Sequence, residues 1–131
     1  MEYWRTLKEN PSGEKSMDDF AIAIDKIPKI VFSRTLKNTE WDSAKLSTKS
    51  LEEMVLELKQ QSDRDIFIGS RSLIVNLTRL NLIDEYPLCV HPVVAGKGLP
   101  LFEGIQDRTV FKLLKTEIFK SGAIILYYDR N

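Results

Sequence analysis

The part of the chain between residues 65 and 102 constrains the fold most strongly. It contains an apolar run at Asp65–Ile68, a glycine turn, a helical pattern at Ser72–Leu80, an apolar run at Tyr86–Val94 and a glycine-rich loop. A glycine turn that leads from a strand into a helix presents free backbone N–H groups at the positive end of the helix, where a phosphate can bind. We therefore expect a strand–helix–strand unit with an anion site at its turn. The residues of that turn are Gly69, Ser70, Arg71 and Ser72.

A second turn of the same kind lies upstream. The apolar run Lys29–Phe32 ends in Ser33, Arg34 and Thr35. Hydroxyl and guanidinium groups donate hydrogen bonds readily to phosphate oxygens. Here they follow the end of a second predicted strand. The two turns together indicate an extended ligand with more than one phosphate, of which a dinucleotide is the simplest. The alternative for Arg34 and for Arg71 is a solvated arginine without a ligand.

The remaining patterns predict further helices and an antiparallel hairpin. Helical spacing occurs at Met17–Ile24 and again after Ser50, where a capping-box spacing precedes a stripe of apolar residues. Two β-rich runs, Thr109–Phe119 and Ala123–Tyr128, are joined by a tight-turn signal at residues 120–122, and the second run has almost no polar alternation. The order of elements predicts one three-layer α/β domain over residues 1–131, with a mostly parallel sheet and a C-terminal antiparallel hairpin.

Composition excludes several classes of protein. Nineteen basic and nineteen acidic residues cancel, so no net charge favours nucleic acid or an anionic membrane. No apolar run approaches the ~18 residues of a membrane span and no secretory signal opens the chain, so we expect a cytoplasmic protein. The single cysteine, Cys89, is interpreted as a small buried side chain, with a reactive thiol as the alternative. A single histidine, His91, does not predict a metal site.

Five segments taken in order resemble the dihydrofolate-reductase-like superfamily, in the branch that contains the reductase domain of the bifunctional riboflavin-biosynthesis deaminase–reductase. The segments are KIVFSRTL, SLEEMVLELK, DIFIGSRSL, LIDEYPLCVHPVVAGKGLPLF and FKSGAIILYY. The resemblance implies an NADPH-dependent reductase that transfers hydride to a small heterocyclic or carbonyl substrate. It also implies that Ser33, Arg34 and Thr35 receive the adenosine 2′-phosphate and that the turn at residues 69–72 receives the pyrophosphate.

The resemblance suggests substrate-pocket residues as well. These are His91, Gly96 and Lys97, for which the alternatives are a core histidine and a flexible turn. Ser70 stands where dihydrofolate reductases carry a second glycine, which makes folate chemistry less expected. Members of the superfamily begin with elements that have no counterpart here, so we expect an N-terminal segment to be absent, and no proton donor is assigned.

Two other functions stay open at this point. A non-catalytic or degenerate nucleotide-binding protein would keep the phosphate site, and a structural or interaction domain would keep only the fold. The N-terminal segment that we expect to be absent contains strands of the sheet in other members of the superfamily. A sheet without these strands would have unpaired apolar edges, so we also expect a homodimer.

Overall fold

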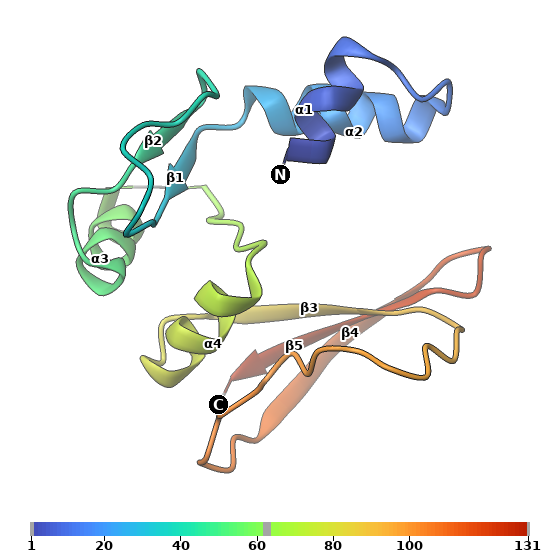
Figure 1. Cartoon of the computed structure of the whole chain (residues 1–131). Helices are drawn as coiled ribbons and strands as arrows, with labels where there is room; N and C mark the ends of the chain where they lie inside the picture. The colour runs from blue at the N-terminus through green and yellow to red at the C-terminus, as the bar shows by residue number, and fades with distance from the viewer. Residues whose placement is uncertain (1, 62–63, 131) are drawn as a thin grey trace. The chain divides into compact units, whose positions relative to one another are not determined.

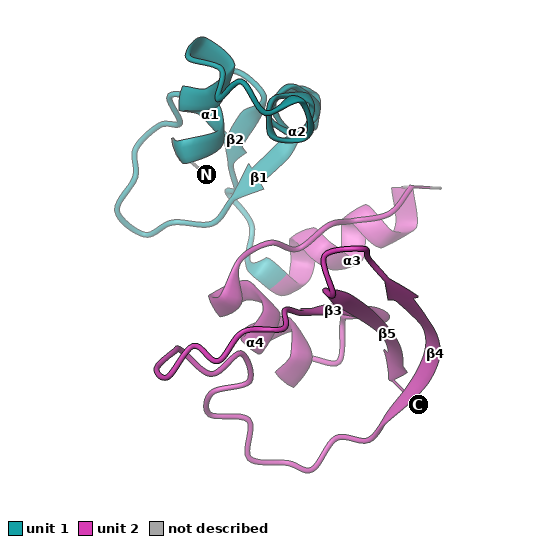
Figure 2. Ribbon diagram, turned by 90° about the vertical axis from the view of Figure 1, so that its right-hand side faces the viewer, with its two compact units in different colours: residues 1–51 teal, residues 52–131 magenta. Residues whose placement is uncertain are grey.

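The computed structural model describes residues 2–61 and 64–130 (Figure 1). Two compact units divide the chain at residue 51, and each is described by itself (Figure 2). The single domain over residues 1–131 stays a prediction. None of the helices in the described ranges is long and apolar enough to cross a membrane.

The first unit combines a helical pair with a small parallel sheet. Its elements are α1 (Glu2–Glu9), α2 (Lys15–Lys26), β1 (Lys29–Val31) and β2 (Ala44–Leu46). Leu7 and Ala21 are buried between the helices, and the rings of Trp4 and Phe20 meet edge to face with centroids 4.7 Å apart. Helix α2 ends before Pro28, because a residue that precedes proline disfavours the helical conformation. Strands β1 and β2 pair in parallel, with Lys29 opposite Ala44.

The second unit contains two helices and an antiparallel sheet. Its elements are α3 (Leu51–Gln61, whose first residue belongs to the first unit), α4 (Arg71–Arg79), β3 (Glu85–Val90), β4 (Phe111–Ile118) and β5 (Ile124–Arg130). The strand order is β3-β5-β4, and both pairings are antiparallel. Gly122, with φ of +85°, closes the turn between β4 and β5. The predicted C-terminal hairpin is therefore confirmed.

Helix α4 and the sheet share a core around Tyr86. This residue and Leu77 are buried, and the Tyr86 hydroxyl donates to Thr78 Oγ1 at 3.1 Å. Arg130 from β5 donates to the carbonyl oxygen of Thr78 at 2.7 Å, so the last strand is tied to the same helix. Asn81, two residues after the end of α4, is left-handed with φ of +60°. This turn lets the N–H of Leu82 donate to the carbonyl oxygen of Leu77 at 2.9 Å.

Several expectations are corrected by the structure. The mixed α/β class is confirmed, but parallel pairing is limited to β1 and β2, so the mostly parallel sheet is wrong for the described residues. The expected buried strand Asp65–Ile68 forms no strand, and Phe67 is 80% exposed. A strand needs a partner for its backbone hydrogen bonds, and no described strand pairs with this segment. Strand β2, in turn, was not expected from the sequence.

Candidate functional site

The turn after β1 carries the first group of predicted phosphate ligands. Ser33 Oγ accepts hydrogen bonds from the backbone N–H groups of Thr35 at 3.2 Å and Leu36 at 3.1 Å. This side-chain-to-backbone turn fixes the local chain path. The hydroxyl oxygens of Ser33 and Thr35 lie 3.4 Å apart, and both residues are exposed.

Arg34 projects from the middle of this turn and is exposed. It makes no hydrogen bond or ion pair with any other residue in the part of the chain that the structure describes. Its guanidinium group therefore keeps all its donors for a ligand or for water. Two hydroxyl groups flank it, so the turn can supply a charged fork of donors together with neutral ones.

The second group of predicted ligands begins α4. Ser70 is the N-cap residue, and its carbonyl oxygen accepts the N–H of Ile74 at 2.9 Å. Its side chain makes no capping bond, and its Oγ lies 3.0 Å from Ser72 Oγ instead. The first-turn N–H groups are therefore not capped by a side chain, and they lie at the positive end of the helix dipole.

Gly69 precedes the N-cap without adopting a left-handed conformation. A Cβ at this position would lie 3.3 Å from Cε1 of the Phe67 ring. That contact is tight, but the ring belongs to an exposed side chain that can move. The free protein therefore does not need glycine here for its backbone conformation, and a close approach by a ligand remains the reason we predict for it.

Arg71, unlike Arg34, has partners within the protein. Its Nη1 donates to Glu103 Oε2 at 2.6 Å and to the carbonyl oxygen of Pro100 at 3.1 Å. Two turns along α4, Arg79 Nη2 donates to the carbonyl oxygen of Gly104 at 2.9 Å. These pairings could not be predicted from the amino-acid pattern, because the partners are distant along the chain.

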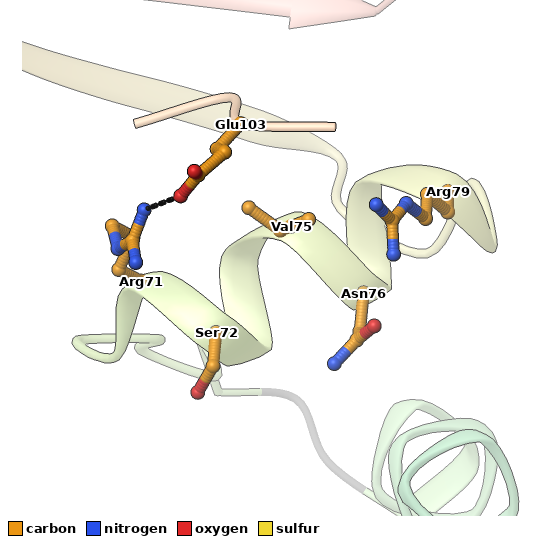
Figure 3. Close-up of a pocket in the computed structure, with 6 residues that line it drawn as sticks. All are labelled: Arg71, Ser72, Val75, Asn76, Arg79 and Glu103. Carbon is orange, nitrogen blue, oxygen red and sulfur yellow. Dashed lines mark hydrogen bonds and ion pairs between the residues drawn. The ribbon is translucent and has the colours of Figure 1, made fainter. Parts of the chain in front are cut away.

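A cavity of about 200 Å³ lies along this side of α4 (Figure 3). Its lining residues are Arg71, Ser72, Val75, Asn76, Arg79 and Glu103. In Figure 3 the side chain of Arg71 extends to Glu103 and Val75 points toward the same segment, whereas Ser72 and Asn76 point away from it. The positively charged part of the cavity is therefore the side that faces Glu103.

The predicted substrate-pocket residues follow β3 in an exposed segment. His91 is exposed, and its Nε2 lies 3.5 Å from the sulfur of Cys89, which is also exposed. The interpretations of His91 as a core histidine and of Cys89 as a buried side chain are therefore wrong. Gly96 has φ of +71°, and the N–H of Lys97 donates to the carbonyl oxygen of Ala95 at 2.8 Å. A turn is thus observed at these residues, and their contact with a ligand stays a prediction.

A network of charged and aromatic groups fixes β1 and β2 in the first unit. Asp25 accepts hydrogen bonds from Lys8 Nζ and from Trp41 Nε1, each at 2.6 Å. The bond from Lys8 and then that from Trp41 hold the pKa of the Asp25 carboxyl below its usual range. Lys29 lies over the Trp41 ring, 4.0 Å from its centroid, and burial lowers the pKa of its ammonium group. The network anchors the strand that leads to Ser33.

The predicted site residues are divided between the two units. Ser33, Arg34 and Thr35 lie within residues 1–51, and all the others lie within residues 52–131. Neither of the described ranges contains a group of three or more His, Cys, Asp or Glu side chains that could hold a metal ion. The functional features are thus two donor-bearing turns, one after β1 and one at the start of α4.

The amino-acid sequence shows which family the chain belongs to. The chain belongs to the RibD C-terminal domain family, whose model matches residues 3–125.

Two proteins of Bacillus subtilis (strain 168) are similar in sequence. The uncharacterized protein YyaP is 36% identical over 124 residues, which are 94% of this chain and 64% of YyaP. The uncharacterized protein YwjB is 36% identical over 74 residues, or 56% of this chain and 42% of YwjB. The chain therefore spans less than two thirds of the length of either relative.

Two solved structures share the fold. A putative riboflavin biosynthesis protein from Shewanella sp. PV-4 has a TM-score of 0.71 at 22% identity, over 89% of this chain and 71% of that protein. A pyrimidine reductase-like protein from Corynebacterium diphtheriae has a TM-score of 0.54 at 16% identity, over 92% of this chain and 47% of that protein. At these identities the likeness concerns the fold alone.

Proposed function

We propose that this chain is part of an NADPH-dependent reductase that transfers hydride to a small heterocyclic or carbonyl substrate. Membership of the RibD C-terminal domain family supports a reductase of the riboflavin-biosynthesis type. The observation that carries the proposal is the exposed Arg34, which has no partner in the described ranges and stands between two hydroxyl residues.

The turn after β1 suits the 2′-phosphate that distinguishes NADPH from NADH. A guanidinium group offers a planar set of donors to phosphate oxygens, and hydroxyl groups complete the coordination. Ser33 already uses its oxygen as an acceptor for two backbone N–H groups, so its O–H remains a donor. The residues that would hold the 2′-phosphate are therefore Ser33, Arg34 and Thr35.

The start of α4 suits the pyrophosphate. Its uncapped N–H groups and the hydroxyl groups of Ser70 and Ser72 are donors at the positive end of a helix. Gly69 leaves room for the ligand to approach the backbone, because it carries no Cβ. Arg71 would join this set once its guanidinium is released from Glu103.

When bound, the cofactor would supply the hydride, and the protein would bind and orient both reactants. His91, Gly96 and Lys97 lie in an exposed segment and could provide polar contacts to a substrate. The names of the two structural neighbours, a putative riboflavin biosynthesis protein and a pyrimidine reductase-like protein, favour a nitrogen heterocycle as that substrate.

A second candidate function is a nucleotide-binding protein of the same fold without catalysis. It would bind NADPH through the same two turns, so the contacts of Arg34 and Arg71 do not distinguish it from the reductase and only turnover does.

Thermal melting with and without NADPH tests both functions. A ligand at ~100 times its dissociation constant adds about 2.7 kcal/mol to the free energy of unfolding. Stabilisation by NADPH, with NADPH oxidation when pyrimidine or pterin substrates are added, would support the reductase. Stabilisation without oxidation of NADPH would support the second candidate. The absence of any shift with NADPH, under conditions where the protein is folded, would refute both.

A further inference from the structure

The segment between β3 and β4 is fastened to α4 by two arginines. Arg71 holds the carboxylate of Glu103 and the carbonyl oxygen of Pro100, at 2.6 and 3.1 Å respectively. Arg79 holds the carbonyl oxygen of Gly104 at 2.9 Å. Residues 100–104 are thus attached at two points, one at each end of the helix.

The ring of Phe102 lies within the fastened segment. It meets Tyr86 with centroids 6.1 Å apart and Phe111 with centroids 6.2 Å apart. Aromatic packing of this kind persists when a surface ion pair opens, because it does not depend on charge. The segment can therefore lose its contact with Arg71 and still keep its place on the sheet.

The cavity beside α4 has an excess of positive charge. Arg71, Val75 and Arg79 follow one another at intervals of one helical turn, so their side chains share one side of the helix (Figure 3). Two guanidinium groups and one carboxylate line this cavity of about 200 Å³. The Glu103 carboxylate therefore occupies a place where the oxygen atoms of an anionic ligand would find the same donors.

The bond between Arg71 and Glu103 is open to exchange. The two side chains are 41% and 60% exposed, so water competes for both groups. Ion pairs of this kind contribute little to stability. A phosphate group carries more charge and more acceptor oxygens than a carboxylate, and it forms the same forked bonds with arginine. The free-energy cost of replacing the Glu103 carboxylate by a phosphate at Arg71 is therefore small.

From this geometry we infer that Glu103 is an internal competitor for the anion site at Arg71. A phosphate-bearing ligand displaces the Glu103 carboxylate, takes the Arg71 guanidinium and releases residues 100–103 from the start of α4, while Arg79 retains Gly104. The identity of that ligand as NADPH rests on the proposed function. The exchange of carboxylate for phosphate does not, so inorganic pyrophosphate is a sufficient probe.

The first test compares the affinity for pyrophosphate of three proteins by titration calorimetry at low salt. Glu103→Gln removes the competing charge and keeps the side-chain size, so it should bind pyrophosphate about two- to fivefold more tightly than the wild type. Asp107→Asn is the matched control, because Asp107 is exposed in the same connection and has no partner among the described residues. Its affinity should equal that of the wild type.

An unchanged or weakened affinity in Glu103→Gln would overturn the inference, since Glu103 would then be neutral or would position Arg71 for the ligand. An equal gain in Asp107→Asn would also overturn it, because the effect would then be one of net charge. No binding of pyrophosphate to any of the three proteins would exclude the site itself.

Nuclear magnetic resonance gives a readout that does not depend on affinity. Saturation with pyrophosphate should move the carboxylate carbon resonance of Glu103 in the wild type toward its position in Arg71→Ala, where the ion pair is absent. A Glu103 resonance that stays in place while pyrophosphate binds would overturn the inference.

NADPH separates this inference from the proposed function. If NADPH does not bind but the pyrophosphate results are as expected, the proposed function fails and the competition by Glu103 stands. If NADPH binds equally to the wild type and to Glu103→Gln, the competition fails and the proposed function stands.

Discussion

Three glycines after β3 differ in backbone conformation and in what an added methyl group would contact, and this difference yields a quantitative prediction. Gly104 has φ of +72°, and a Cβ there would lie 2.7 Å from Nη2 of Arg79. Gly96 has φ of +71° with nothing within 4 Å of its Cβ position. Gly98 combines open space with an ordinary φ. Alanine substitutions at these three positions therefore separate backbone strain from steric contact.

The expected costs follow from these geometries. Alanine in the left-handed conformation costs about 1–2 kcal/mol, which is partly offset because alanine also restricts the unfolded chain by about 0.4–1 kcal/mol. Gly96→Ala should therefore lose roughly 0.5–1 kcal/mol. Gly104→Ala should lose about 1–2.5 kcal/mol, because it also displaces Arg79 from the Gly104 carbonyl, a bond of about 0.5–1.5 kcal/mol. Gly98→Ala should be neutral or slightly stabilising.

Denaturant unfolding measures these differences, and thermal melting should show about 3–5 °C for each kcal/mol in a chain of this size. In an Arg79→Ala background the cost of Gly104→Ala should fall to that of Gly96→Ala, because the displaced bond is already absent. Equal costs at Gly104 and Gly96 in the wild-type background would show that Arg79 does not hold the segment. Costs at both positions equal to that at Gly98 would refute the left-handed turns.

Gly69→Ala completes the series with a different expectation. Gly69 is not left-handed, and its near neighbour is the mobile ring edge of Phe67, so the stability of the free protein should change little. Binding of NADPH should weaken, because a Cβ would stand where the pyrophosphate approaches the backbone. Wild-type affinity in the folded variant would contradict this placement of the pyrophosphate.

Three further predictions follow from other parts of the structure. Arg34→Ala should weaken NADPH binding about ten- to a hundredfold, as measured by titration, with little effect on the binding of NADH. Lys37→Ala, the control, should change the affinity for neither cofactor. Equal losses for both cofactors in Arg34→Ala would exclude Arg34 as a ligand of the 2′-phosphate. Because the folded pKa of Asp25 is lowered, its contribution to stability is present above about pH 4 and is lost as the pH falls through the lowered value, so Asp25→Asn should flatten the acid limb of a stability–pH profile. Light scattering should give the mass of a homodimer, since Val90 and Ile118, which are 51% and 74% exposed, leave one end of the sheet apolar. Its interface should bury more than ~1,000 Å², and a stable monomer at micromolar concentration would contradict this prediction.

Local signals in the sequence predicted local structure well. The capping-box spacing at Ser50 precedes a helix that begins at Leu51, and the turn signal at Gly122 lies in the β4–β5 hairpin. The Ser33 turn also follows a strand, as expected. Each of these features depends on residues within a few positions of one another, so the chain pattern contains the necessary information.

Features that depend on distant partners could not be predicted in this way. Asp65–Ile68 has the composition of a strand, but a strand forms only with a neighbour, and no described strand pairs with it. Cys89 lies in an apolar run, which indicates a buried side chain, but it lies on the face of β3 opposite Tyr86, and that face is exposed. The partner of Arg71, Glu103, lies far along the chain, so the sequence left open whether this arginine was solvated.

The two arginines that we predict as phosphate ligands, Arg34 and Arg71, therefore differ in the free energy that each can contribute to binding. Arg34 begins without a partner, so a phosphate that binds it has only to replace water and restrict one flexible side chain. Arg71 begins in an ion pair, so part of any new bond replaces an existing one, and the net gain is smaller. Selectivity for a phosphorylated ligand is thus expected to depend mainly on the turn after β1. The start of α4 would contribute its backbone donors, and it would gain the arginine only as Glu103 gives it up.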